Sequence, residues 1–328
     1  MAARMTFYAQ QSANKRKSLL LLISVGLILG VMGFAIGVGT TGDPYGGLGF
    51  TVIAVIIAVA LAVGSYFGGD RAVLAASDAK PVDETTHQQL MNVVREMAIA
   101  ANVPMPKVYV IPDSALNAFA TGRDPEHASV AITQGLLDRL DREELQGVIA
   151  HELGHVRNYD IRFMLLIGVL VGGVALMADM FLRYSFFFGR GRGRSSDRGG
   201  GGGGIFQLVM LVVAVVLAIL APIAARLVQM SVSRQREYLA DATAVELTRN
   251  PSGIENALWK LGTDREVLEV ANRSTQHLYI VNPIRKFEER SSSLWSTHPP
   301  LADRIDRLRQ LHSAPPLNAE QRAILAGH

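Results

Sequence analysis

Residues 151–155 read HELGH, with two histidines four residues apart and a glutamate beside the first. In a helix, residues four apart share one face, so His151 and His155 can bind one metal ion. Glu152 then points at the metal-bound water. Zinc lowers the pKa of such a water, and Glu152 would take its proton and deliver it to the leaving amine of a peptide bond. The alternative is a pair of surface histidines.

The surrounding helix carries an apolar face of Val148, Ile149 and Leu153, which predicts a buried helix with its metal face turned to a cleft. A catalytic zinc ion has three protein ligands and one open position, so a third ligand must come from elsewhere. The extended pattern HExxHxxGxxH is absent, because residues 158–161 read NYDI. A carboxylate on a later helix is the remaining common solution.

Residues 234–241 read RQREYLAD, and Glu237 and Asp241 share a helix face because they are four apart. Glu237 can complete a His2Glu set, and Asp241 can accept the free ring N–H of a histidine ligand and fix its tautomer. The spacing is equally compatible with two solvated carboxylates that pair with Arg234 or Arg236.

Two folded segments must position these residues. Residues 82–160 have the pattern of a soluble unit, and the chain returns to soluble character after residue 231. The periodicity predicts helices over 86–101, 142–159, 234–248, 253–261 and 301–311, and strands over 107–111 and 128–133. We therefore expect a mainly α protein with a small β-sheet, an α+β fold.

Four apolar segments are long enough to cross about 30 Å of hydrocarbon. They cover residues 19–38, 48–67, 163–182 and 208–225. The first two predict a membrane hairpin rather than a cleaved signal peptide, because the second run follows the first almost at once. Basic residues flank this hairpin and its connection carries only Asp43, so the positive-inside rule places both ends, and the domain that follows, in the cytoplasm.

The last two apolar segments separate the histidines from Glu237, which must all lie in one compartment. An even number of crossings satisfies this requirement. The Arg- and Gly-rich linker 189–204 would then be exported, against the positive-inside tendency, unless the two segments form a hairpin that does not fully cross. The predicted division of the chain is an N-terminal cytoplasmic segment 1–17, a transmembrane hairpin 18–69, catalytic parts 70–160 and 231–312 around a second membrane hairpin 161–230, and a C-terminal tail 313–328.

Composition excludes several classes of protein. The net charge of +3 is too small for a nucleic-acid-binding protein without a basic patch, so no nucleic acid is expected. The chain has no cysteine, which excludes disulfides, thiolate zinc sites and cysteine nucleophiles. Any metal must therefore be held by histidine and carboxylate ligands.

Five motifs occur in a fixed order along the chain. They are NAFATG at 117–122, ITQGLL at 132–137, HELGH at 151–155, REYLAD at 236–241 and STHPPLADRI at 296–305. In this order they resemble the HtpX family of membrane metalloproteases, relatives of the CAAX prenyl proteases. The resemblance implies a gluzincin-like fold with one Zn²⁺ on His151, His155 and Glu237, and Glu152 as the base.

The resemblance also implies roles outside the metal set. Residues 117–120 and 128–133 look like a strand pair beside the metal helix, and an unpaired edge there can bind an extended peptide by strand addition. By resemblance Asn117 and Ala118 contact substrate, and His298 and Arg304 stabilise the oxyanion. The alternatives are an ordinary hairpin, a histidine that caps a loop and a solvated arginine.

We therefore expect an integral membrane zinc endopeptidase in the inner membrane that cleaves misfolded or membrane-associated proteins at the cytoplasmic face. The quality-control and stress-response role, and a partner membrane protease, come from the resemblance. The rival interpretations are a CAAX-type processing protease and a non-catalytic zinc-binding membrane scaffold. A transporter is disfavoured because the apolar segments lack paired intramembrane charges.

Overall fold

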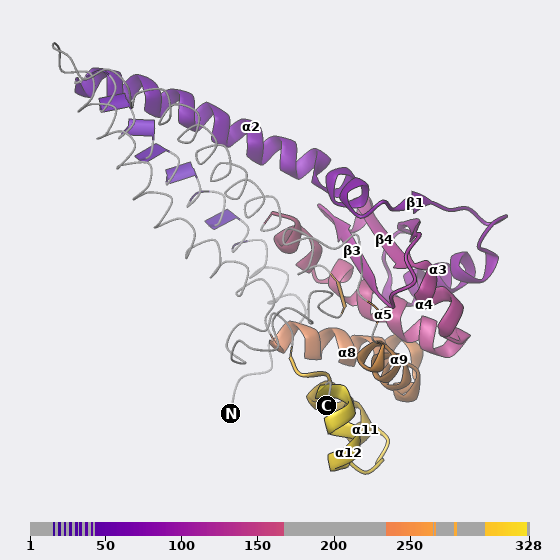
Figure 1. Ribbon diagram of the computed structural model, residues 1–328. Helices are drawn as coiled ribbons and strands as arrows, with labels where there is room; N and C mark the ends of the chain where they lie inside the picture. The colour runs from indigo at the N-terminus through magenta and orange to yellow at the C-terminus, as the bar shows by residue number, and fades with distance from the viewer. Residues whose placement is uncertain are drawn as a thin grey trace, which may run out of the picture.

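The computed structural model describes residues 43–166, 234–264, 266, 279–280 and 299–326, and single positions between Arg16 and Thr41. These residues form a long helix attached to a domain in which helices pack on a small sheet (Figure 1). The helices are α2 (Pro44–Ala76), α3 (Gln88–Ala101), α4 (Gln134–Arg139), α5 (Arg142–Arg157), α8 (Arg234–Thr248), α9 (Pro251–Thr263), α11 (Leu301–Leu311) and α12 (Ala319–Ala326), with a short 3-10 turn at Pro125–His127. The strands are β1 (Lys80–Pro81), β2 (Lys107–Ile111), β3 (Ala118–Gly122) and β4 (Ala128–Thr133).

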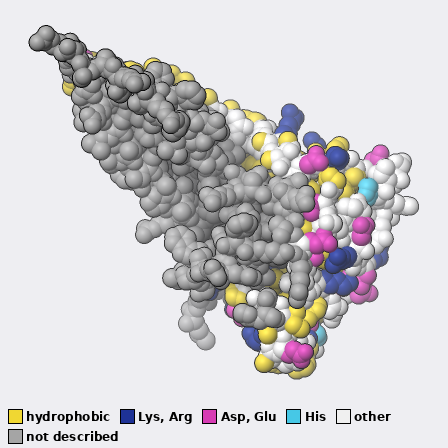
Figure 2. Space-filling model, viewed as in Figure 1, with side chains coloured by type: hydrophobic (Ala, Val, Ile, Leu, Met, Phe, Trp, Pro, Cys, Tyr) yellow, Lys and Arg dark blue, Asp and Glu magenta, His cyan; other side chains and the backbone are white. Residues whose placement is uncertain are grey.

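Helix α2 extends away from the domain, and hydrophobic side chains lie along its visible surface (Figure 2). Within the described ranges it is the one helix long and apolar enough to cross a membrane, and only 6% of its most apolar window is buried. The described positions between Arg16 and Thr41 are helical, and Gly30, Gly33 and Gly37 among them lie against α2. A Cβ placed on Gly33 would come within 2.7 Å of the Ala54 Cβ, so the close approach of these helices requires glycine there.

The sheet has the order β1-β2-β4-β3, with β2 and β4 parallel at its centre and antiparallel pairs on both sides. Every residue of β3 and β4 is buried, because helices cover the sheet. The predicted strands 107–111 and 128–133 are confirmed, and the predicted strand pair 117–120 with 128–133 is the antiparallel pair β3–β4. The short strand β1 was not predicted, because two residues carry no periodicity.

Helix α5 is the central element of the domain. A capping box starts it: the Asp141 side chain accepts from the Glu144 N–H, and the Glu144 side chain accepts from the Asp141 N–H. It is buried from Gly147 through Val156 and packs against α3, α8, α9 and β3. The predicted apolar face is confirmed, and helices on its other faces bury the histidines as well.

Two glycines let neighbouring helices approach α5. A Cβ at Gly147 would lie 2.6 Å from the backbone nitrogen of Ile254 in α9. A Cβ at Gly154, inside HELGH, would lie 3.3 Å from the Thr243 Cβ in α8. The second contact matters for the site, since α8 carries Glu237.

The predicted helices 234–248 and 301–311 match α8 and α11. The C-terminal segment 313–328 contains helix α12, which was predicted only as a tail. Its Leu325 is buried and packs against Gly262 of α9. The single apolar anchor explains why the periodicity of this short helix gave no signal.

The predicted membrane segment 163–182 begins inside the domain. Residues 160–166 are helical, and Phe163 through Leu166 are buried by the protein. Leu165 lies against Gly69 near the end of α2. The remainder of this segment, the segment 208–225 and the linker 189–204 lie outside the described residues.

We predict that Gly147→Ala destabilises the protein by about 1–3 kcal/mol, because the added methyl group collides with α9 backbone that cannot rotate away. The measurement is the midpoint of thermal unfolding in detergent. Gly68→Ala is the control, since no atom of the described residues lies within 4 Å of a Cβ built there. Equal midpoints for the two variants would contradict the packing described here.

Candidate metal centre

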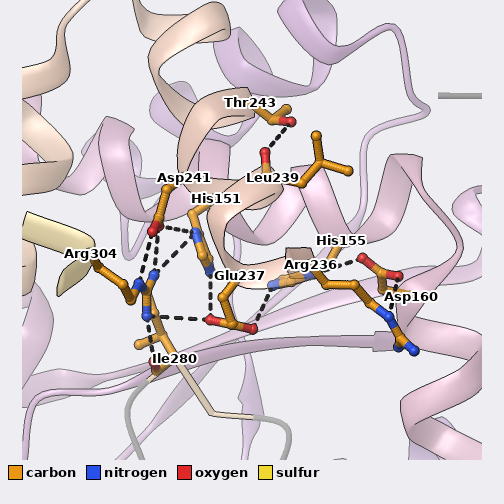
Figure 3. Close-up of polar contacts among 10 residues, drawn as sticks. All are labelled: His151, His155, Asp160, Arg236, Glu237, Leu239, Asp241, Thr243, Ile280 and Arg304. Carbon is orange, nitrogen blue, oxygen red and sulfur yellow. Dashed lines mark hydrogen bonds and ion pairs between the residues drawn. The ribbon is translucent and has the colours of Figure 1, made fainter. Parts of the chain in front are cut away.

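Three side chains from two helices converge in the interior of the domain (Figure 3). His151 and His155 stand one turn apart on α5, and Glu237 faces both from α8. The Glu237 carboxylate lies 3.8 Å from His151 Nε2 and 3.6 Å from His155 Nε2. One ligand atom from each residue lies within 4.8 Å of the others, and all three residues are buried. This separation allows a single ion to contact all three.

The other nitrogen of each ring is held by a carboxylate. His151 Nδ1 lies 3.0 Å from Asp241 Oδ1, and His155 Nδ1 lies 3.1 Å from Asp160 Oδ2. Each carboxylate accepts a hydrogen bond from Nδ1, so a neutral ring carries its hydrogen on Nδ1 and turns the Nε2 lone pair toward Glu237. Both rings are therefore oriented as metal-binding histidines usually are.

His151 shows that the site fits a cation. Its Nε2 is buried and has no hydrogen-bond partner among the described residues, although buried polar atoms are nearly always paired. Burial lowers the pKa of His151 despite the opposing effect of Asp241. The ring is thus neutral, with a lone pair aimed at the Glu237 carboxylate, and a metal ion is the partner that fits this arrangement.

His155 differs from His151 in its charge. Burial would lower its pKa, but the hydrogen bond to Asp160 and the charge of Glu237 outweigh burial and raise the pKa to about 9. Without a metal the ring is therefore protonated near neutral pH and donates toward both carboxylates. A metal must displace this proton to bind, so metal affinity falls as the pH is lowered.

Glu152 lies beside the ligands and is buried. Desolvation raises the pKa of Glu152 to about 7, against the lowering effects of His155 and of a hydrogen bond from the Ala120 backbone N–H. A carboxyl group with a pKa close to the operating pH can both accept and return a proton.

Arg304 reaches the site from α11 and is fully buried. Its Nε and one terminal nitrogen bond Asp241 at 2.9 and 2.6 Å, and its other terminal nitrogen lies 3.3 Å from Glu237 Oε2. Burial opposes its charge, but Asp241 more than compensates, so the pKa of Arg304 is raised and the group stays protonated. The interpretation of Glu237, Asp241 and Arg304 as solvated surface charges is therefore wrong.

The predicted substrate residues lie at the start of β3, where Ala118 is the first residue of the strand and Asn117 immediately precedes it. The Asn117 backbone faces β4, since its carbonyl accepts from the Thr133 N–H, and its side chain accepts from the Ala118 N–H. The Ala118 carbonyl points to the other edge, where it accepts from Ile280 N–H. His298 lies outside the described residues.

Asp160 is the site residue that sequence reasoning missed. It follows the end of α5, where Tyr159 adopts a left-handed conformation (φ 60°) that sends the chain back toward the helix. Asp160 then contacts His155, and Arg236 lies 3.8 Å from its other oxygen. The signal available in the sequence was an aspartate five residues after the second histidine, but a five-residue offset matches no helical spacing.

A buried group of two histidines and a glutamate, with a second glutamate beside it, defines a metallopeptidase site. The profile of peptidase family M48 matches residues 84–312, and the chain belongs to this family and is a metallopeptidase.

Similar proteins cover nearly the whole chain. A "Protease HtpX homolog" from Streptococcus agalactiae is 44% identical over 304 residues, and one from Lactobacillus acidophilus is 41% identical over 305 residues. Each match covers 93% of this chain and 99% of the relative. The crystal structure of S. mikatae Ste24p is similar with a TM-score of 0.48 at 21% identity, over 91% of this chain and 66% of that chain, so this chain spans slightly under two thirds of that protein.

We predict that Asp160→Asn weakens Zn²⁺ binding by about 10–100-fold, because a neutral amide accepts more weakly than a carboxylate from His155 Nδ1 and leaves the ring a less basic ligand. A competition titration against a fluorescent chelator at fixed pH measures the affinity. Asp138→Asn, an exposed position outside the site, is the control. An unchanged affinity in Asp160→Asn would remove Asp160 from the site.

Proposed function

We propose that the chain is a zinc-dependent endopeptidase of a cell membrane that hydrolyses peptide bonds of misfolded or membrane-associated proteins at the cytoplasmic face. The observation that carries the proposal is the pair of rings with Nδ1 on a carboxylate and Nε2 toward Glu237. This donor set suits zinc, which prefers nitrogen and carboxylate ligands in tetrahedral sites with one open position. The fold is expected to be gluzincin-like.

His151, His155 and Glu237 would hold the zinc ion. When bound, zinc polarises a peptide carbonyl and makes water acidic enough to react near neutral pH. The Glu152 carboxylate accepts the proton from the attacking water and passes it to the leaving nitrogen. Its buried position next to His155 and its pKa of about 7 support both transfers.

Arg304 holds two other site residues in place through its bonds to Asp241 and its contact with Glu237. The nitrogen that faces Glu237 also donates to a backbone carbonyl, that of Ile280, at 3.3 Å. The same nitrogen is thus suited to a substrate carbonyl, and we assign Arg304 this role together with His298. A positioned donor of this kind is worth roughly 2.7–4 kcal/mol in the transition state.

The membrane location rests on α2. Its apolar side chains from Leu48 to Phe67 are largely exposed, and a surface of this kind is stable in lipid but not in water. Residues beyond α2 lead directly into the sheet, so the domain lies close to the bilayer. The proposed topology has two membrane hairpins, four crossings in total and a cytoplasmic catalytic domain. The proposed partners are the lipid bilayer and protein substrates. A partner membrane protease is a further prediction.

We predict that Glu152→Gln retains zinc and cleaves a reduced, unfolded protein about 10²–10⁴-fold more slowly, because the variant cannot carry the proton. Bound metal is measured by atomic emission and cleavage by appearance of new amino termini. Glu143→Gln, on the exposed side of the same helix, should behave like the unmodified protein. Equal cleavage by Glu152→Gln would refute the proposed mechanism.

The absence of cysteine permits a clean test of topology. In intact cells of a bacterial host, Asp43→Cys should react with a membrane-impermeant maleimide, because residue 43 lies in the connection of the first hairpin. Glu320→Cys, exposed on α12, should react only after lysis. The reverse pattern would place the catalytic domain outside the cell.

A further inference from the structure

Among the residues that the structure describes, β3 is the last strand of the sheet, and its outer edge pairs with no other strand. The Asn117 carbonyl is hydrogen-bonded to β4. Because successive residues of an antiparallel strand direct their N–H and C=O groups to opposite edges, Ala118, Ala120 and Gly122 direct theirs to the outer edge. Ala120 N–H is used by Glu152, which places this edge beside the catalytic carboxylate. An extended peptide that adds to β3 would use the groups on this edge.

The chain itself bonds several of these groups: the Asn117 side chain accepts from the Ala118 N–H, and the Ala118 carbonyl accepts from Ile280. Ile280 N–H donates to the Ala118 carbonyl at 3.0 Å. The Ile280 carbonyl accepts from Arg304 at 3.3 Å (Figure 3). The same Arg304 nitrogen lies 3.3 Å from Glu237. The main chain of Ile280 therefore connects the outer edge of β3 to the Arg304 guanidinium, which lies beside the proposed metal ligand Glu237.

Tyr279 anchors this residue. Its ring packs edge to face on Phe119 of β3, with centroids 5.0 Å apart, and its hydroxyl lies 3.2 Å from the Ser77 hydroxyl just after α2. Both Tyr279 and Ile280 are buried. The dipeptide forms a bend rather than a strand. The Tyr279 side chain packs in the hydrophobic cluster with Phe119, the Ile280 side chain packs in the main core, and Ile280 also makes the two main-chain contacts.

We propose that Tyr279–Ile280 occupies, in the resting protein, the position on the outer edge of β3 that an extended substrate takes during catalysis. This inference rests on the proposed peptidase function. Both main-chain groups of Ile280 are bonded as a substrate residue would be, the N–H by the edge strand and the carbonyl by a cation. Substrate and the dipeptide then exclude each other.

An internal occupant of this kind lowers apparent affinity without changing the chemistry. The observed dissociation constant equals the intrinsic constant divided by the fraction of molecules in which the edge is free. Variants that loosen the dipeptide should therefore bind and capture substrate better, with KM reduced and kcat unchanged. A purely structural dipeptide predicts the opposite, since its loss would damage the site.

The first test measures binding without turnover, in the full-length Glu152→Gln protein in lipid nanodiscs. The probe is a fluorescein-labelled synthetic peptide with the sequence of residues 275–284, TQHLYIVNPI. Adding Tyr279→Ala removes the contacts with Phe119 and Ser77 and should tighten binding by about tenfold, whereas Tyr45→Ala, at an exposed position on α2, should not. Unchanged, weaker or undetectable binding by a Tyr279→Ala protein that retains its zinc would overturn the proposal.

The second test needs no substitution at residue 279, so it tests the proposal even if the Tyr279→Ala protein does not fold. Hydrogen exchange of the Ile280 amide is followed in the Glu152→Gln protein with and without a saturating unfolded protein substrate. The proposal requires faster exchange with substrate bound, because Ile280 N–H leaves Ala118. Protection that persists would overturn it. These outcomes can be told apart from a failure of the proposed function, which fails if Glu152→Gln cleaves as fast as the unmodified protein.

Discussion

The structure depends on an electrostatic constraint in the middle of the domain. Of the residues that the structure describes, four carboxylates, from Glu152, Asp160, Glu237 and Asp241, are buried there with two guanidinium groups, from Arg236 and Arg304. With neutral rings and ionised carboxylates, four negative and two positive charges leave a deficit of two. Unbalanced buried charge is costly, and one divalent cation removes the deficit. The protonated His155 and the raised pKa of Glu152 are the responses expected of the same site without its ion.

The surrounding elements bury this cluster and fix the positions of its side chains. Helix α5 is buried along the turns that carry the two histidines, and Gly154 lets α8 approach until Glu237 faces both rings. Arg304 joins α11 to Asp241 and Glu237, so the last part of the chain fixes the orientation of ligands that precede it by many residues. The contact between Leu165 and Gly69 joins the segment after the metal helix to α2. The metal centre and the proposed membrane anchor are thus parts of one packed unit.

The elements and residue pairs that follow a helical or strand periodicity could be predicted from the sequence. HELGH and the spacing of Glu237 and Asp241 identified residues that the fold brings together, and the strands β2 and β4 and the helices α8 and α11 began and ended where their patterns did. The contact of Asp160 with His155 depends on one left-handed residue, and the position of Ile280 depends on tertiary packing, so neither leaves a periodic signal. The burial of Arg304 was likewise invisible, because a basic residue in an amphipathic helix is usually exposed.

The most direct test of the account is zinc K-edge X-ray absorption on the purified full-length protein. We expect one zinc per chain, with two imidazole nitrogens at about 2.0–2.1 Å and oxygen ligands in the rest of the shell. Replacement of Glu237 by alanine should reduce the oxygen contribution while both imidazoles remain in any metal still bound. A protein that binds no zinc, or a spectrum with fewer than two imidazoles, would contradict the claim that His151, His155 and Glu237 hold the ion.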